Sequence, residues 1–191
     1  MAFWTSALSE PKRKHRFILR FPELITPDGD FAYAEYLAKS VSKPSYTVGT
    51  TEHKFLGNTY YYPGAVTWNE CTATIVNSVS PDGNELLYQA LQQMGYLKPD
   101  IQEDVFLQNL PASTPNKQAA LAALGQVQFD ELSGEGGTLG TWKLNNAFLT
   151  NVTFGDLDYA GEDLLDIQMT IKYDWATYDV GLATRALANI S

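Results

Sequence analysis

The residues best suited to chemistry form an acidic turn near the C-terminus, with carboxylates at Asp156, Asp158, Glu162, Asp163 and Asp166. Asp156, Asp158 and Gly161 occupy positions 1, 3 and 6 of an EF-hand calcium loop. The match then fails, because positions 5 and 12 require oxygen ligands and hold Ala160 and Ile167. Paired carboxylates could also perform acid–base catalysis, but only in a pocket that shifts their pKa values. We therefore interpret residues 155–163 as a solvated turn between two strands.

Other motifs that could support catalysis or nucleotide binding are incomplete. The glycine-rich stretch 134–140 does not match G-x-G-x-x-G, because residue 139 is leucine and no βαβ context accompanies it. A Ser–His–Asp triad would have to use His15 or His53, each in a polar context. Cys71 is the single cysteine, which excludes an internal disulfide and a cysteine-based zinc site. The sequence predicts no catalytic residue, no cofactor and no metal site.

Charge and length limit the class of protein further. The 191 residues suit one domain, and 13 Lys and Arg against 22 Asp and Glu give a net charge of −9. This negative net charge disfavours a broad surface that binds DNA or acidic lipid. The basic cluster at 12–16 lacks interleaved aromatic residues, so a solvated edge or a salt bridge is favoured over a phosphate site.

Targeting signals are not evident in the sequence. No stretch approaches the roughly 18 apolar residues that span a bilayer. The opening residues 1–6 place apolar side chains before the basic cluster, which is the reverse of a signal peptide. We expect a protein that is made in the cytoplasm and has no membrane partner.

Alternation of apolar and polar residues predicts a mainly β, antiparallel sandwich or partial barrel. The strand at 164–175 is the clearest, and a long hairpin or extended arm is predicted at 46–64. One helix at 82–95 starts either at an Asp82–Glu85 capping box or at Ser80-Pro81, and stops at Gly95. A short Ala-rich helix is expected at 117–124. The predicted core contains Phe17, Leu19, Trp68, Leu87, Leu91, Ile167, Met169, Ile171 and Tyr173.

The whole chain, 1–191, is predicted to form a single domain. Its parts are an N-terminal segment 1–13, the arm 46–64, the helix 82–95, an insertion 97–140 and a C-terminal tail 178–191. The run Tyr60-Tyr61-Tyr62 of the arm and the N-terminal Phe3 and Trp4 lie outside the predicted core. Exposed aromatic side chains of this kind mark contacts with partners.

The order of these elements resembles the tail tube proteins of contractile-tailed bacteriophages. Trp68 opens an alternating strand that leads through Val76-Asn77 into the helix, and residues 168–175 look like the closing strand of that family. The opening residues 1–6 are similar to versions from marine and freshwater phages. Residues 97–140 and 176–191 depart from the shorter family pattern. The resemblance covers about two-thirds of the chain and runs through 36–44, 46–64, 66–77, 82–95, 145–158 and 164–175.

This resemblance implies a structural virion protein that forms hexameric rings, stacked into a hollow tail tube inside a contractile sheath. The inner wall would be a β-barrel built jointly by six subunits. Partners would be the sheath, the baseplate and the tail terminator, with tape-measure protein and genomic DNA in the lumen without specific binding. A duplex-sized barrel needs more strands than the 16–18 of porins, which several subunits can supply. Sharing the barrel also removes exposed sheet edges.

The resemblance also assigns roles to surfaces. The polar face of the last strand is expected to line the lumen through Asp166, Gln168, Thr170, Lys172 and Asp174, with a carboxylate beside Lys172. The alternative is that this polar face contacts outside solvent or the sheath. Inter-ring contact is expected from Phe3, Trp4, Phe55, Leu56, Tyr60, Tyr61 and Tyr62.

Two other functions stay open at this stage. One is a tube initiator or baseplate hub protein of the same fold. The other is a β-sandwich hydrolase acting on cell wall, which would need a cleft with converging polar groups.

Overall fold

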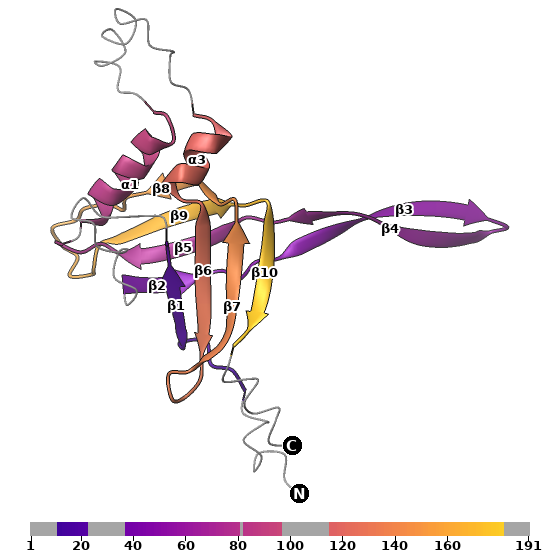
Figure 1. Ribbon diagram of the computed structural model, residues 1–191, viewed down its shortest axis with the longest axis horizontal. Coiled ribbons are helices and arrows are strands. Elements are labelled where there is room, and N and C mark those ends of the chain that lie inside the picture. Colours follow the sequence, from indigo (N-terminus) through magenta and orange to yellow (C-terminus); the bar gives the residue numbers. More distant parts are fainter. Residues whose placement is uncertain (1–10, 23–36, 81, 97–114, 182–191) are drawn as a thin grey trace, which may run out of the picture.

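The computed structural model describes residues 11–22, 37–80, 82–96 and 115–181 (Figure 1). Every strand pair in this part is antiparallel, so the prediction of a mainly β, antiparallel fold is confirmed. The strands are β1 Phe17–Arg20, β2 Ala38–Val41, β3 Tyr46–Phe55, β4 Asn58–Trp68, β5 Cys71–Val76, β6 Gln126–Leu132, β7 Thr138–Asn145, β8 Phe148–Thr153, β9 Asp166–Lys172 and β10 Trp175–Val180. The helices are α1 Gly83–Gln93 and α3 Lys117–Ala123.

Two four-stranded sheets and one hairpin make up the β structure. Sheet I has the order β1-β6-β7-β10, sheet II has the order β2-β5-β9-β8, and β3 pairs with β4 alone. Figure 1 shows the strands of sheet I running steeply across those of sheet II, which is the orthogonal form of a β-sandwich. The chain passes from sheet II into sheet I between β9 and β10.

The core lies between the two sheets and follows strand alternation. On β9, Ile167, Met169 and Ile171 are at most 1% exposed, and they lie opposite the buried residues of β5. Sheet I contributes a matching set from β6 and β7: Val127, Phe129 and Leu144. Tyr173 follows β9 and is buried among these residues.

Capping residues set where the helices begin. The Asp82 carboxylate accepts a hydrogen bond from the Asn84 backbone at 2.9 Å, so α1 begins after Asp82. Gly95 follows α1 with a φ of +108°, a value that favours glycine, and stops the helix as predicted. Asn116 caps α3 in the same way, accepting from the Ala119 backbone at 2.9 Å.

The helices pack against the sandwich beside β8. Leu86, Leu87 and Ala90 of α1 join the main core. Met94 at the end of α1 packs with the buried alanines of α3 and with Phe148 of β8. The short helix expected at 117–124 therefore exists and completes this corner of the fold.

Six of the nine predicted core residues are buried. Leu19, Leu87 and Tyr173 are at most 4% exposed, while Phe17 and Trp68 are half-buried. Leu91 is wrong as a core residue, because its side chain is 40% exposed. The sandwich contacts only a narrow stripe of α1, and Leu91 lies at the edge of that stripe.

Three segment boundaries differ from the prediction. The strand expected at 66–77 is interrupted after Trp68, where the Asn69 backbone donates to the Ser45 carbonyl at 2.9 Å. The strand expected at 164–175 ends at Lys172, and β10 then extends to Val180, so residues 178–180 are not tail. Residues 126–140, the end of the predicted insertion 97–140, contribute to β6 and β7 in the centre of sheet I.

Truncating a buried core residue should lower the free energy of unfolding far more than truncating the exposed Leu91. We expect Ile171→Ala to lower the free energy of unfolding by about 2–5 kcal/mol, because it opens a cavity in the core. Leu91→Ala should cost less than about 1 kcal/mol, since that side chain already meets water. Urea denaturation followed by circular dichroism measures both. Equal losses in the two variants would contradict this assignment of the core.

Candidate assembly surfaces

The arm, formed by β3 and β4, projects away from the sandwich (Figure 1). Its tip is a two-residue turn between the paired Phe55 and Asn58, in which Leu56 and Gly57 have φ values of +47° and +79°. Positive φ at both positions is the geometry that joins strands of right-handed twist. Every residue of the two strands is exposed except Trp68. An isolated two-stranded ribbon is marginally stable in water, so contact with another surface would stabilise the arm.

Aromatic and aliphatic side chains cover both faces of the arm. Tyr61 is 66% exposed, and Tyr60 and Tyr62 on the opposite face are about half exposed. The predicted inter-ring residues Phe55 and Leu56 lie at the tip, with 58% and 84% exposure. Phe3 and Trp4 lie outside the described residues.

The root of the arm is fixed to the core by aromatic contacts. The rings of Tyr46 and Trp68 meet edge to face with centroids 5.5 Å apart. Trp68 in turn lies 6.0 Å from the buried Tyr173. The Cys71 thiol lies 3.7 Å from the Tyr173 hydroxyl, and burial together with this contact raises the pKa of that hydroxyl.

The outer face of sheet II is polar and mostly uncharged. In register, Thr72 lies opposite Thr170 and Thr74 lies opposite Gln168. β8 adds Asn151 beside Thr170 on the other side of β9. The predicted lumen-facing residues of β9 thus share one face, and Gln168 is exposed there.

The charged residues of this face are paired. Lys172 donates to Glu70 at 3.1 Å, so it has the neighbouring carboxylate that the sequence suggested, although Glu70 lies on the connection after β4. Lys39 donates to Asp166 at 2.5 Å, and this contact raises the pKa of Lys39. Lys117 donates to Asp174 at 2.6 Å, and this contact lowers the pKa of Asp174. The face therefore carries little net charge.

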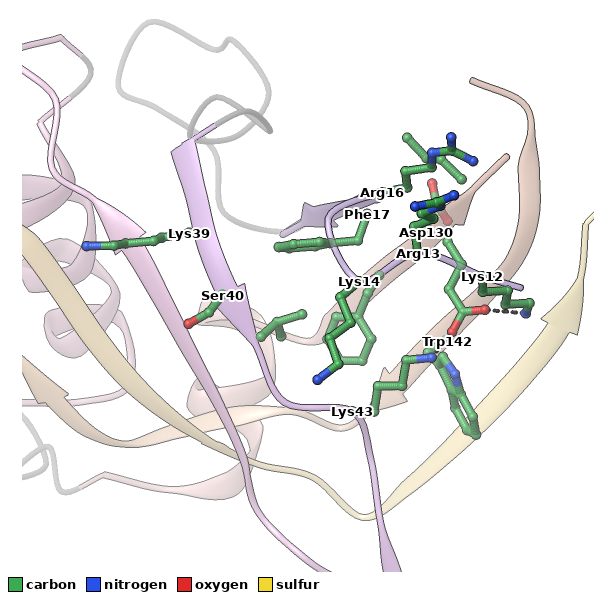
Figure 2. Close-up of a pocket in the computed structure, with 14 residues that line it drawn as sticks. Lys12, Arg13, Lys14, Arg16, Phe17, Lys39, Ser40, Lys43, Asp130 and Trp142 are labelled. Carbon is green, nitrogen blue, oxygen red and sulfur yellow. Dashed lines mark hydrogen bonds and ion pairs between the residues drawn. The ribbon is translucent and has the colours of Figure 1, made fainter. Parts of the chain in front are cut away.

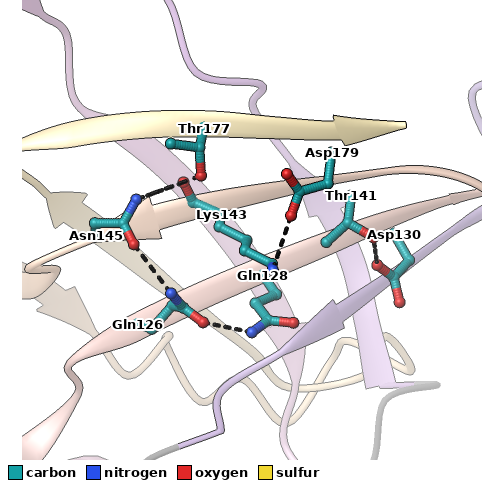
Figure 3. A network of polar contacts seen from close by, with 8 residues as sticks. All are labelled: Gln126, Gln128, Asp130, Thr141, Lys143, Asn145, Thr177 and Asp179. Atoms are coloured by element: carbon teal, nitrogen blue, oxygen red, sulfur yellow. Dashed lines mark hydrogen bonds and ion pairs between the residues drawn. The ribbon is translucent and has the colours of Figure 1, made fainter. Parts of the chain in front are cut away.

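Sheet I has a second polar outer face, shown in Figure 3. Gln126 donates to Asn145 at 3.0 Å, and Lys143 pairs with Asp179 of β10 at 2.8 Å. Asp130 is almost fully buried and pairs with Arg20 of β1 at 3.0 Å. Prediction from sequence missed this face, because residues 126–140 were assigned to the insertion 97–140. The available signal was the alternation of Gln126, Gln128 and Asp130 with apolar residues.

A basic pocket of about 530 Å³ opens between the N-terminal segment, β1, β2, β6 and β7. Figure 2 shows cationic side chains around it and the Trp142 ring on its wall. Lys12 and Lys43 both donate to Glu131, so part of the basic cluster at 12–16 forms the salt bridge favoured from sequence. Burial opposes ionisation, yet the two ammonium groups hold the pKa of Glu131 below its ordinary value.

The acidic turn is solvent-exposed across 155–163. The Asp158 carboxylate accepts from the Ala160 backbone at 3.0 Å, a local turn contact. Within the described residues, no three His, Cys, Asp or Glu side chains cluster so as to hold a metal ion. No helix in the same part of the chain has the length and apolar character needed to cross a membrane.

No protein-family model and no curated protein sequence matches this chain. Several solved structures, in contrast, are similar to it in fold. A chain in the cryo-EM structure of the anti-feeding prophage cap, which terminates the AFP tube, aligns at 17% identity and a TM-score of 0.61, covering 94% of this chain and 99% of that one. A chain of the extended PVC sheath–tube complex, from an extracellular contractile injection system, gives 16% identity, a TM-score of 0.62 and coverages of 94% and 99%. A chain of the six-fold symmetrised AFP baseplate aligns at 17% identity and a TM-score of 0.54, covering 88% of this chain and 95% of that one.

The fold is that of tube components of contractile injection systems. The resemblance to tail tube proteins drawn from the sequence is thus confirmed at the level of the fold. Almost the full length of each neighbour is covered, so this tube fold spans the arm, both sheets and the helices.

Glu131 of β6 forms ion pairs with Lys12 of the N-terminal segment and with Lys43, which follows β2. The stability that these ion pairs give to the folded protein should depend on pH. Because the pKa of Glu131 is lowered in the folded protein, the stabilisation is present above the ordinary value of 4.5 and is lost as the pH falls through the folded-state pKa. We expect Glu131→Gln to cost about 1 kcal/mol at pH 7, a small value because both ammonium groups are half exposed. The difference from wild type, measured by urea denaturation, should be full at neutral pH and should close as the pH falls below 4.5. The matched control Glu135→Gln, in the β6–β7 turn, should have no effect; a loss equal to that of Glu131→Gln, or one independent of pH, would contradict this role.

Proposed function

We propose that this protein is a structural subunit of a contractile tail tube, in which hexameric rings stack into a hollow conduit. The observation that carries the proposal is the arm: an ordered, aromatic-rich hairpin on a tube fold, exposed at every residue except Trp68. In a bacteriophage tail, the sheath would surround this tube, and the baseplate and terminator would close its ends. Tape-measure protein and genomic DNA would pass through the lumen, and the assembled protein would reside in the virion.

The arm suits contact between rings. It extends beyond the sandwich, so it can reach a neighbour that the two sheets cannot touch (Figure 1). Its single acid, Glu52, and single lysine, Lys54, balance each other in charge. A neutral, aromatic surface resembles the core of protein interfaces, from which charged residues are depleted.

The outer face of sheet II suits the wall of the lumen. Its threonines, Gln168 and Asn151 offer no charge, and its lysines have carboxylate partners. Each unpaired Lys or Arg contact with phosphate would add adhesion, so a neutral polar lining allows a polyanion to slide. The outer face of sheet I is the alternative lining, with its own paired charges.

A terminator, initiator or baseplate component is the second candidate. A chain of the AFP tube-terminating cap and a chain of the AFP baseplate resemble this protein about as well as a chain from a sheath–tube complex does. Self-assembly distinguishes these roles, because a repeating tube subunit forms long tubes alone, whereas an end component forms single rings. The neighbours belong to structural assemblies, and we propose no catalytic role.

Shortening the arm should separate folding from stacking. Replacing residues 51–62 with an Asn-Gly turn removes the tip and the tyrosines while preserving the pairing of Thr50 with Pro63. We expect a folded protein whose melting temperature is within a few degrees of wild type, since the removed residues make no core contact. Negative-stain electron microscopy should show isolated rings in place of tubes. Tubes of normal length from this variant would overturn the role of the arm.

Two matched substitutions can identify which sheet face lines the lumen of the tube. Gln168→Lys adds a cation to the outer face of sheet II, and Thr177→Lys adds one to the outer face of sheet I; both residues are exposed. Both variants should assemble, since surface substitutions cost little. Tubes of Gln168→Lys should retain fluorescent duplex DNA on sedimentation, more strongly at low salt, while those of Thr177→Lys should not. The reverse result would assign the lumen to sheet I.

A further inference from the structure

The basic pocket is a feature that the tube role does not use. Six of its lining residues are cationic and two are acidic, in a chain whose overall charge is −9. Its volume of about 530 Å³ lies in the range of ligand pockets. A concentration of positive charge on a negative protein suits an anionic ligand.

Not all of these cations are neutralised internally. Lys12 and Lys43 share Glu131, and Lys39 points away from the others toward Asp166 (Figure 2). Arg13 and Lys14 are exposed, and neither forms an ion pair within the described residues. These two side chains are therefore available to a ligand at the mouth of the pocket.

The floor of the pocket is apolar and aromatic. Phe17, Phe129 and Trp142 line it, with Val41 and Leu132 beside them. A free phosphate or a nucleic-acid backbone would leave these side chains without a partner. The combination of a cationic rim and an aromatic floor matches a peptide segment in which acidic and large apolar residues are interleaved.

The chain itself contains such a segment. The loop 155–164 reads Gly-Asp-Leu-Asp-Tyr-Ala-Gly-Glu-Asp-Leu, and its Leu157 and Tyr159 are 89% and 110% exposed. None of its four carboxylates forms an ion pair with a described residue, although Asp163 acts electrostatically on Lys39 at one end of the pocket. An acidic loop with two unburied large side chains complements the pocket in charge and in polarity.

We propose that the basic pocket of one copy binds the acidic loop 155–164 of a second copy, with Leu157 or Tyr159 on the aromatic floor and the carboxylates on Arg13 and Lys14. The inference rests on the proposed tube function, because it supplies a subunit contact. Within one chain, Leu157 instead lines a separate hollow with Asp82 and Tyr88 of the α1 region. A pocket and a loop at different places on the surface give a heterologous contact, the type that closes rings or builds stacks.

Peptide binding tests the pocket without any need for tubes. The host is full-length protein carrying Asp156→Lys and Asp158→Lys, so that its own loops do not compete. The probe is a fluorescein-labelled peptide of residues 154–165, followed by fluorescence anisotropy. We expect saturable binding that weakens as salt is raised and falls about tenfold or more when Arg13→Glu and Lys14→Glu are added. A peptide with Leu157→Ser and Tyr159→Ser should also bind about tenfold more weakly.

Two results of this assay would overturn the proposal. One is the absence of peptide binding. The other is equal binding of a short DNA duplex of the same charge, which would make the pocket a general anion site.

Charge exchange between copies tests the contact in assembly. The loop variant Asp156→Lys with Asp158→Lys and the pocket variant Arg13→Glu with Lys14→Glu should each fail to assemble alone. Mixed one to one, they should assemble again, because wild-type loops meet wild-type pockets and lysine loops meet glutamate pockets. Gln168→Lys, on the outer face of sheet II, is the control for a charge change elsewhere and should assemble normally.

The outcomes separate this proposal from the tube function. Normal assembly of both single variants would reject the contact while wild-type tubes still support the tube function. Two variants that fail alone and are not restored by mixing would mean that the loop does not act between copies. Wild type that forms neither rings nor tubes would reject the tube function, and the peptide assay would still decide whether the pocket binds the loop.

Discussion

The register between β5 and β9 is the constraint on which the rest of the structure depends. Because side chains alternate along a strand, a slip of one residue would move the whole apolar set to the outer face and leave polar residues in the core. The same register that buries these residues places threonines and Gln168 together on the opposite face. Building the core therefore also builds the uncharged outer surface of sheet II. The paired inward residues are at most 3% exposed: Cys71, Ala73, Ile75, Ile167, Met169 and Ile171.

The register between β5 and β9 also determines where the arm leaves the sandwich. β4 ends at Trp68 and β5 begins at Cys71, so the root of the arm lies next to the most buried part of sheet II. Trp68 contacts Tyr173, which follows β9 and meets Cys71. An exposed ribbon held rigidly at its base loses less conformational freedom on binding than a free loop would. The aromatic tip can thus be presented to a partner without a core of its own.

Prediction from sequence succeeded where one pattern dominates a segment. The alternation on β9, the apolar stripe and glycine stop of α1, and the aromatic arm each gave the correct element. It failed where the pattern continues through a change of direction: Tyr173 and Trp175 keep the period of two, although the chain leaves sheet II after Lys172. The ion pair of Lys43 with Glu131 joins residues 88 apart in sequence, and only tertiary packing brings them together. β6 was undervalued because its outer residues are as polar as those of a loop.

In the proposed tube, copies of a chain with a net charge of −9 would have to associate despite their electrostatic repulsion. At physiological ionic strength the Debye length is about 8 Å, so charges on distant parts of two subunits are screened and only groups near the contact matter. The surfaces described above meet this condition in two ways. The arm and the outer face of sheet II are locally neutral, through balanced or paired charges. The excess acid is concentrated at 155–163, and the same fold concentrates excess base at the pocket. Segregating charge in this way lets repulsion over most of the surface coexist with attraction at defined places, which favours one geometry of association over random aggregation.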